Sequence, residues 1–268
     1  MQTALSQSSP RGSDHGYVPT VASSAGDAEK AILLYLARTS GAGPATENDR
    51  SALAEAVTEV VAFDNNRSLA AFPLRADHRY VVIEGWAYRA HTLPNGLCQI
   101  TDLFLPGDCF GRIETGWHEA RPVLRSCGRM KVAALRQEIV AGQDIVSLRA
   151  RWGWLRDANA RVLRSRLISL GRRDARERVA RFMVEVQGRL NAVGLVRGGA
   201  FICPLTQEQL ADIVGLTAVH INRVLKRLRD EGLLLVDRPR VLIPDTTALN
   251  AATGFPPSIA RVNEEKVA

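Results

Sequence analysis

The sequence predicts an α+β protein in which a β-rich roll or barrel, a long helix and a winged helix-turn-helix follow one another. Three observations predict this order: short β-prone runs broken by turn residues over 79–135, a helical apolar stripe over 143–170, and two short helices over 205–232. The chain of 268 residues is 46% hydrophobic, which is enough to bury a substantial core. Its length suits two modest domains.

Composition favours a polyanionic partner. The formal net charge is +7 and the sequence pI is about 9.7, a balance typical of proteins that bind nucleic acid. Apolar runs long enough to cross a bilayer are missing, and the Ser-rich N-terminus lacks the apolar stretch of a signal peptide. We therefore expect a cytoplasmic protein with no membrane partner.

The N-terminal part is predicted to be a tail followed by two helices. Residues 1–27 are rich in Ser, Gly and Pro, a composition that does not offset the entropy lost on ordering. Helical spacing recurs over 28–38 and over 47–63, and Thr46 is a plausible N-cap for the second helix. We expect these helices to pack on the β-rich region, so that 28–142 forms one domain.

The β-rich region is predicted from four runs with turns between them. The runs cover residues 80–83, 86–93, 99–104 and 131–135. The turns contain Gly85, Asn95-Gly96 and Pro106-Gly107-Asp108. Many short strands with such turns are typical of a small barrel or roll.

The cysteines predict neither a disulfide framework nor a metal centre. They are scattered, without a CxxC pair, at Cys98, Cys109, Cys127 and Cys203. His118 lies between two of them, yet buried thiols in strands explain these positions more simply than a metal or haem site. Paired carboxylates, a nucleophile elbow and a phosphate loop are also missing. We expect no metal, no cofactor and no enzymatic activity.

The long helix over 143–171 is predicted to be a dimerisation helix. Apolar residues at alternating spacings of three and four form a coiled-coil seam. The seam comprises Ile145, Leu148, Trp152, Leu155, Asn159, Leu163 and Leu167. The alternative is that it packs onto the chain's own β-domain, and partial use of both is expected. Asn159 either fixes the register of two copies or faces solvent, and Gly171 is predicted to end the helix.

Residues 205–232 carry the strongest motif. Thr206 caps a first helix, with Gln209 reaching back in a capping box. Gly215 permits a sharp turn, and Thr217 caps the second helix. The inward face of that helix consists of Ile221, Val224, Leu225 and Leu228. Such a helix fits the major groove of B-DNA, whereas a plain helical pair in a bundle is the alternative.

We expect the DNA contacts to come from the helix starts and the outward face. The expected contact residues are Thr206, Gln207, Thr217, Ala218, Val219, His220, Asn222, Arg223, Lys226 and Arg227. Downstream, β-prone runs over 233–236 and 241–243 are separated by a four-residue link over 237–240. We interpret this hairpin as a wing whose two arginines lie along a phosphate backbone, or as an ordinary surface turn. An amphipathic helix starting near Ala175 precedes the motif, so 172–247 is the expected DNA-binding domain and 248–268 a C-terminal tail.

Three stretches together resemble the Crp/Fnr family of bacterial transcription regulators. They are YVVIEGWAYRAHTLPNGLCQITDLFLPGDCFG (80–111), SLGRRDARERVARFM (169–183) and the helix-turn-helix of 205–232. The resemblance covers residues 79–244. It implies a β-roll like a cyclic-nucleotide-binding domain, a dimerisation helix and a winged helix-turn-helix. It further implies a homodimer on a near-palindromic double-stranded DNA site, with RNA polymerase as a partner.

The chain departs from the better-known members in the second helix of the motif. Those members place Arg-Glu or Val-Glu where this chain has Ala218 and Val219, and only Arg223 matches. A different half-site is therefore expected, because the glutamate that accepts from a cytosine is missing. Val219 is expected to touch a thymine methyl and Arg223 to pair with guanine. His220 and Asn222 are expected to reach bases or phosphates.

A second departure lies in the expected ligand pocket, which the resemblance places at Gly111, Arg112 and Arg121. Cyclic-nucleotide-binding members have Gly-Glu-Leu where this chain has Gly111-Arg112-Ile113, so cyclic AMP is not expected to bind. A cysteine set before Cys98, which would ligate an iron–sulfur cluster, is also missing. The alternative function is an allosteric β-roll protein that binds a small ligand and for which DNA binding is secondary.

Overall fold

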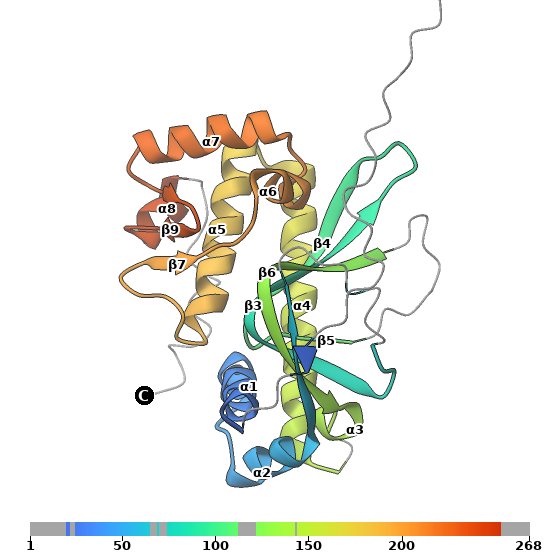
Figure 1. The fold of residues 1–268 in the computed structure, drawn as a ribbon. Coiled ribbons are helices and arrows are strands. Elements are labelled where there is room, and N and C mark those ends of the chain that lie inside the picture. The colour runs from blue at the N-terminus through green and yellow to red at the C-terminus, as the bar shows by residue number, and fades with distance from the viewer. Residues whose placement is uncertain are drawn as a thin grey trace, which may run out of the picture.

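The structure is a computed structural model that describes residues 20–21, 25–64, 69, 74–111, 122–142 and 144–252. Figure 1 shows a sheet region and a helical region joined by one long helix, α4. The helices are α1 (Ala25–Arg38), η1 (Ser40–Ala42), α2 (Glu47–Ala56), α3 (Gln137–Val140), α4 (Val146–Arg172), α5 (Ala175–Asn191), α6 (Gln207–Val214), α7 (Ala218–Asp230) and α8 (Thr246–Ala252). The strands are β1 (Thr20–Val21), β2 (Val57–Phe63), β3 (His78–Thr92), β4 (Cys98–Phe104), β5 (Cys109–Gly111), β6 (Pro122–Arg136), β7 (Ala200–Ile202), β8 (Leu235–Asp237) and β9 (Arg240–Leu242).

The larger sheet is antiparallel and is built around β3 and β6. Its strand order is β1-β2-β6-β3-β4, and β5 also pairs with β3. The first two predicted β runs are one strand, β3, and the fourth is part of the longer β6. Register shifts on either side of Glu84 bend the β3–β6 pair. Gly85 makes this bend possible, because its φ is +69° and a Cβ there would lie 2.0 Å from the carbonyl oxygen of Arg129.

The prediction of one helix over 47–63 is wrong in its second half. Thr46 caps α2 through a reciprocal capping box with Asp49, as the sequence predicted for the cap. The helix ends at Ala56, and the next seven residues form β2, which pairs with β6. Val57, Val60 and Val61 explain the change, because β-branched residues fit a pleated sheet and its partner strand outweighs the helical spacing.

Aromatic and aliphatic side chains fill the inside of the sheet region. Tyr80 and Phe110 stack with ring centroids 5.6 Å apart, and Phe104 lies 5.3 Å from Phe110. Met130 and Val132 from β6 complete this core. These residues bury the apolar surface that stabilises the sheet.

The first half of α4 belongs to the chain's own core, which corrects part of the predicted dimer seam. Leu148 and Leu155 are fully buried against α1, α2 and the sheet, and Ile145 and Trp152 pack against the same cluster. Arg151 is buried beside them and donates to Asp49 at 3.3 Å and to the carbonyl oxygen of Thr39 at 3.2 Å. These apolar side chains therefore pack against the chain's own helices and sheet. This is the intramolecular alternative to a dimer seam that the sequence left open.

In the second half of α4, the residues of the predicted seam are exposed and not buried. Asn159, Leu163 and Leu167 are exposed in the single chain. The helix also runs through Gly171 and ends at Arg172, so the predicted stop at this glycine is wrong by one residue. A glycine costs a helix only about 1 kcal/mol, which packing of the neighbouring turns offsets.

The helical region is a winged helix-turn-helix formed by α5 to α8 and a small sheet of strand order β7-β9-β8. Strand β7 was not predicted from the sequence. The wing turn is also tighter than predicted, because Asp237 pairs with Arg240 and only residues 238–239 connect the strands. The predicted C-terminal tail begins later than 248, since Leu249 in α8 is fully buried in this unit. At the other end, β1 lies within the predicted N-terminal tail and pairs with β2.

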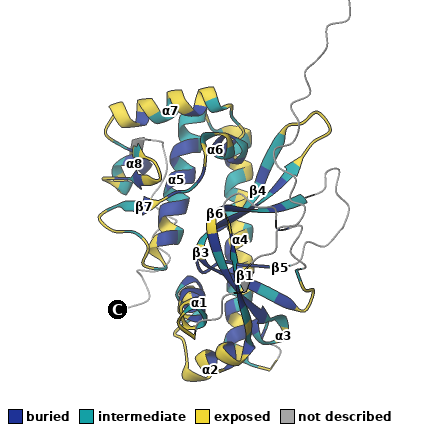
Figure 2. Cartoon of the chain, in the orientation of Figure 1, coloured by how far each residue is buried: buried dark blue, intermediate teal, exposed yellow. Residues whose placement is uncertain are grey.

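One continuous apolar core joins the two regions. It combines Trp86, Ile100 and Leu103 from the sheet with Phe182 and Leu210 from the winged unit. Figure 2 shows buried and half-buried residues along most of α5, and its buried residues include Val179, Phe182 and Val186. The winged unit is therefore docked on β3 and β4 and is not tethered only through the α4–α5 connection.

A buried ion network crosses the same boundary. Asp108, in the turn before β5, accepts from Arg38 Nε of α1 at 2.7 Å and from Arg189 of α5. Arg189 also donates to Glu185 at 3.0 Å, and Glu185 accepts two hydrogen bonds from Arg166 of α4, at 2.9 and 3.1 Å. Burial by itself would raise the pKa of Asp108, but Arg189 and Arg38 hold that pKa below its usual range.

We predict that Asp108→Asn lowers the free energy of unfolding at pH 7 by about 3–5 kcal/mol, because it leaves two buried guanidinium groups short of their anion. The folded-state pKa of Asp108 is depressed, so its contribution is full above the unfolded value near ~4 and is lost as the pH falls below it. Urea titrations at several pH values measure both effects, and the variant should lose less stability on acidification than the wild type. Asp230→Asn, at an exposed carboxylate of α7, is the control. Equal stability of the Asp108 variant and the wild type would contradict the assigned role.

Candidate nucleic-acid interface

The first helix of the motif, α6, is fixed at both ends by its own sequence. The Thr206 hydroxyl accepts from the Gln209 amide at 3.1 Å, and Gln209 Oε1 accepts from the Thr206 amide at 2.9 Å, so the predicted capping box is confirmed. Leu210, Ile213 and Val214 form its buried stripe. The cap and the stripe together orient the turn that follows.

The turn between the helices depends on Gly215, which adopts the left-handed conformation with φ +65°. Thr217 then accepts from the His220 amide at 3.3 Å and caps α7, again as predicted. A left-handed residue followed at once by an N-cap reverses the chain within a few residues, so α7 starts close to the end of α6.

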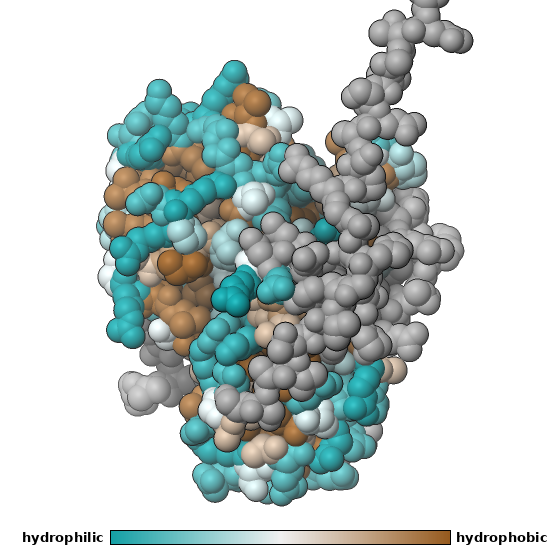
Figure 3. All heavy atoms as spheres, in the orientation of Figure 1, coloured by the Kyte–Doolittle hydropathy of each residue, from teal (hydrophilic) through white to brown (hydrophobic). Residues whose placement is uncertain are grey.

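The second helix, α7, is strongly amphipathic. Ile221 and Leu228 are fully buried, and Val224 and Leu225 are half-buried against the same core, so the predicted inward face is confirmed. The outward face is exposed and consists of Val219, His220, Asn222, Arg223, Lys226 and Arg227. Figure 2 shows α7 exposed along the side turned away from the molecule, and in Figure 3 the surface over it is largely hydrophilic.

The structure brings most of the predicted contact residues onto this surface. Ala218 is half-buried and Thr217 is exposed, both at the start of α7. Thr206 and Gln207 lie apart from them, at the start of α6, where Thr206 is exposed and Gln207 half-buried. The arrangement offers one helix face for base edges and two helix N-termini for phosphates.

The C-terminal end of α7 carries an ion-pair cluster. Glu231 accepts from Arg227 at 3.0 Å and also pairs with Arg176 of α5. The hydrogen bond from Arg176, together with that from Arg227, lowers the pKa of Glu231, although burial slightly opposes this. Arg227 is therefore partly neutralised, whereas Lys226 and Arg223 take part in no ion pair among the described residues. The wing adds exposed Arg238 and Arg240 nearby in sequence.

The contacts that hold α6 on the sheet were not predicted from the sequence. Gln99 of β4 donates to the carbonyl oxygens of Asp212 at 2.6 Å and of Ile213 at 3.3 Å. Gln209 lies next to Tyr88, with 3.4 Å between its Nε2 and the Tyr88 hydroxyl oxygen. These contacts join residues more than 100 positions apart, and a single sequence contains no local signal for them.

The predicted ligand pocket is described only in part. Gly111 ends β5, and the guanidinium of Arg79 lies 2.1 Å from the position a Cβ would take there. Arg112 and Arg121 lie outside the described residues. Within the described ranges, no group of three His, Cys, Asp or Glu side chains could hold a metal ion.

All four cysteines are free thiols. Burial raises the pKa of Cys127 to about 12 and that of Cys203 to about 11. Both thiols are therefore protonated at neutral pH. In the described part of the chain, we find no helix with the length and apolar content needed to span a bilayer.

Comparison with known proteins connects this geometry to a family. Residues 177–252 match a model of the Crp-like helix-turn-helix domain. The nitrogen fixation regulation protein FixK of Azorhizobium caulinodans is 29% identical over 177 residues, which cover 65% of this chain and 71% of the relative. The transcriptional activator protein FnrL of Cereibacter sphaeroides is 28% identical over 182 residues, with coverages of 65% and 71%.

A solved structure matches this chain over most of that structure's length. The structure of FixK2 from Bradyrhizobium japonicum has a TM-score of 0.60 and 26% sequence identity, and the match covers 73% of this chain and 96% of that one. Both relatives carry the names of regulators, which are generally not enzymes. With the matched helix-turn-helix and its exposed α7, these likenesses show that residues 177–252 form a Crp-like helix-turn-helix domain and that the chain is similar to transcription regulators of the Crp/Fnr type.

Proposed function

We propose that the protein regulates transcription as a homodimer on a near-palindromic DNA site, with α7 of each copy in the major groove of one half-site. The observation that carries this proposal is the polar, exposed face of α7 held on the buried Ile221 and Leu228. An α-helix fits the major groove, and helix-turn-helix dimers reach half-sites one helical turn apart. Sequencing the DNA that co-purifies with the protein should yield an enriched two-fold motif, and a motif without symmetry would contradict the proposal.

The second half of α4 supports a dimer. Leu163, Leu167 and Ile168 are 55%, 70% and 55% exposed, an apolar surface that a single chain leaves in water. Residues 160, 163 and 167 lie at spacings of three and four on one side of the helix. Packing this side against a second copy would bury it, as in a coiled-coil seam. The proposed interface is therefore shorter than the seam predicted from sequence and omits Leu148 and Leu155.

We predict that Leu163→Glu with Leu167→Glu yields a folded monomer that loses affinity for a two-half-site duplex. The two carboxylates would have to be buried at the interface, while each side chain is exposed in the single chain. Sedimentation or light scattering measures the oligomeric state. Leu195→Glu, at an exposed leucine of the winged unit, is the control and should stay dimeric. An unchanged dimer for the double variant would exclude this interface.

Leu148→Ala, by contrast, should lower the free energy of unfolding by about 2–5 kcal/mol, because Leu148 is buried in the chain's own core.

Within each half-site, we propose that Arg223 reads a base and that Lys226 and Arg227 bind phosphates. Arg223 lies near the start of α7, whereas Lys226 lies a turn later, where a helix leaves the groove floor. Bidentate pairing of a guanidinium with guanine is the commonest specific contact. Val219, at 61% exposure, is placed to touch a thymine methyl.

We predict that Arg223→Ala costs roughly 1–3 kcal/mol at the specific site and relaxes the preference at one base pair per half-site. Lys226→Ala should instead weaken all duplexes similarly and reduce the salt slope by about one unit for each phosphate that the variant leaves unpaired. A panel of single-base variants measured at two salt concentrations separates the two roles. Uniform weakening by Arg223→Ala would transfer the readout to His220 and Asn222.

RNA polymerase is a proposed further partner, because a transcription regulator acts by contacting it or by altering its access to the promoter. We propose that the sheet region acts as a platform and that cyclic AMP does not control it. Tyr80, Phe104 and Phe110 pack against one another in a core cluster of the sheet region, which supports a structural role for this region. The wing arginines Arg238 and Arg240 are exposed and suit contacts with the DNA backbone.

A further inference from the structure

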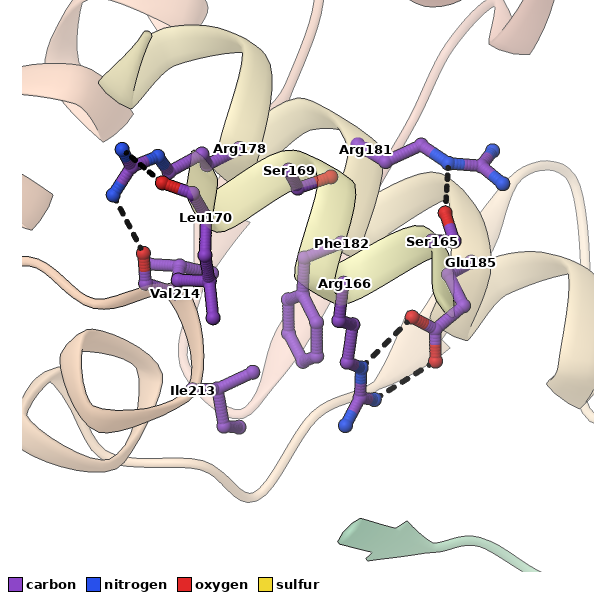
Figure 4. Close-up of a pocket in the computed structure, with 10 residues that line it drawn as sticks. All are labelled: Ser165, Arg166, Ser169, Leu170, Arg178, Arg181, Phe182, Glu185, Ile213 and Val214. Atoms are coloured by element: carbon purple, nitrogen blue, oxygen red, sulfur yellow. Dashed lines mark hydrogen bonds and ion pairs between the residues drawn. The ribbon is translucent and has the colours of Figure 1, made fainter. Parts of the chain in front are cut away.

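Three helix ends meet at the side chain of Arg178. This residue lies in the second turn of α5 and is half-buried. Its Nη2 donates to the carbonyl oxygen of Leu170 at 2.8 Å, and its Nε donates to that of Arg173 at 2.9 Å. Its Nη1 lies 3.4 Å from the carbonyl oxygens of both Val214 and Gly215. Figure 4 shows dashed lines from the guanidinium to the carbonyl oxygens of Leu170 and Val214.

The acceptors belong to two different helix C-termini. Leu170 and Arg173 lie at the end of α4, whereas Val214 and Gly215 lie at the end of α6, in the turn of the motif. The last carbonyls of a helix lack intrahelical donors and carry partial negative charge. A guanidinium can bind several of these carbonyl oxygens at once, because its donors point in several fixed directions within one plane. One side chain thus ties the end of α4 to the turn that orients α7.

Direct packing supports the same connection. A Cβ at Gly215 would lie 2.8 Å from Cδ2 of Leu170 and 3.7 Å from Nη1 of Arg178. The turn of the motif therefore touches the last turn of α4 closely. Leu170 also lines a small pocket with Phe182 and Ile213, so the apolar side of this junction is formed by α4, α5 and α6 together.

The neighbouring Arg176 provides a useful contrast. It reaches the end of α7 through Glu231, an ionisable partner at the surface. The acceptors of Arg178 are backbone carbonyls, which do not titrate, so no change of protonation in an acceptor can break these contacts. The Arg178 contacts therefore form a fixed strut, and they involve none of the residues assigned to DNA contacts or to the dimer surface.

We propose that Arg178 is a positioning residue that sets the angle between α4 and the helix-turn-helix, and through it the distance between the two copies of α7 in the dimer. This inference rests on the proposed function, since a distance between copies matters only for a dimer on a two-fold site. It assigns to Arg178 the preference for one half-site spacing, while the base preference within a half-site belongs to α7.

The test uses the full-length protein and duplexes that carry one half-site, or two half-sites with the spacer changed by one or two base pairs. We expect the wild type to prefer one spacing by about tenfold over its neighbours. Arg178→Ala should bind the single half-site within about twofold of the wild type and should show no spacing preference beyond about twofold. Arg178→Lys keeps the charge but not the planar fork, and should show an intermediate preference. Arg50→Gln, at an exposed arginine of α2, is the matched control.

Each outcome has a distinct meaning. If the wild type binds two half-sites no better than one, the proposed dimer function fails and the role of Arg178 fails with it. If the wild type shows a spacing preference that Arg178→Ala and Arg178→Lys both keep, only the role of Arg178 is overturned. Loss of half-site affinity in a variant that melts at the wild-type temperature would also overturn it, since Arg178 would then support α7 directly. Should Arg178→Ala fail to fold, the spacing preference of Arg178→Lys decides.

Discussion

The buried carboxylate of Asp108 is the constraint on which the arrangement of the two regions depends. It lies in a turn of the sheet region, yet its partners come from α1 and from α5 of the winged unit. An ionised group inside a protein is tolerated only with well-placed partners. Any movement of α5 away from the sheet would separate Arg189 from this anion, and Glu185 and Arg166 would be disturbed in turn. Electrostatics thereby selects one docked position out of the many that apolar packing alone allows.

Apolar packing holds the winged unit and the sheet region together at the same boundary. Trp86, Ile100 and Leu103 lie in one cluster with the inner faces of α5 and α6. Burial of apolar surface is favourable but has little directional preference. The hydrogen bonds from Gln99 to the end of α6 add direction, because donor and acceptor must align within a narrow range. Apolar packing thus holds the winged unit on the sheet region, and hydrogen bonds and ion pairs fix its orientation. The position of the DNA-binding surface depends on both.

Local signals in the sequence predicted the motif better than the rest of the fold. Capping residues and the Gly215 turn act within a few positions, so Thr206 and Thr217 could be assigned from sequence alone. The β2 segment was assigned to a helix because its register on β6 is decided by a strand more than 60 residues away. Leu148 and Leu155 show the same limit. Their spacing indicates a buried stripe, but spacing does not say whether the partner is the chain's own core or a second copy.

The DNA-binding unit likewise contains features that the sequence predicts and features that it does not. Exposure of Asn222 and Arg223 follows from helical periodicity, and the structure confirms it. The strut at Arg178 could not be predicted, because guanidinium-to-carbonyl contacts between helix ends leave no pattern in the residues that provide the carbonyls. Any residue type contributes the same oxygen. Side-chain hydrogen bonds to backbone carbonyls are therefore the contacts that are hardest to predict from a single sequence.

The length of α4 has a mechanical consequence. It comprises 27 residues, which at ~1.5 Å per residue make a rod of roughly 40 Å. One part of this rod is embedded in the core of the sheet region, and its far end touches the turn before α7. The part beyond Leu155 comprises about 17 residues, or roughly 25 Å, so tilting it by about eight degrees displaces its tip by roughly 3.5 Å, close to the rise of one base pair. A disturbance in the sheet region too small to alter its core would thus be magnified into a shift of one step along the DNA.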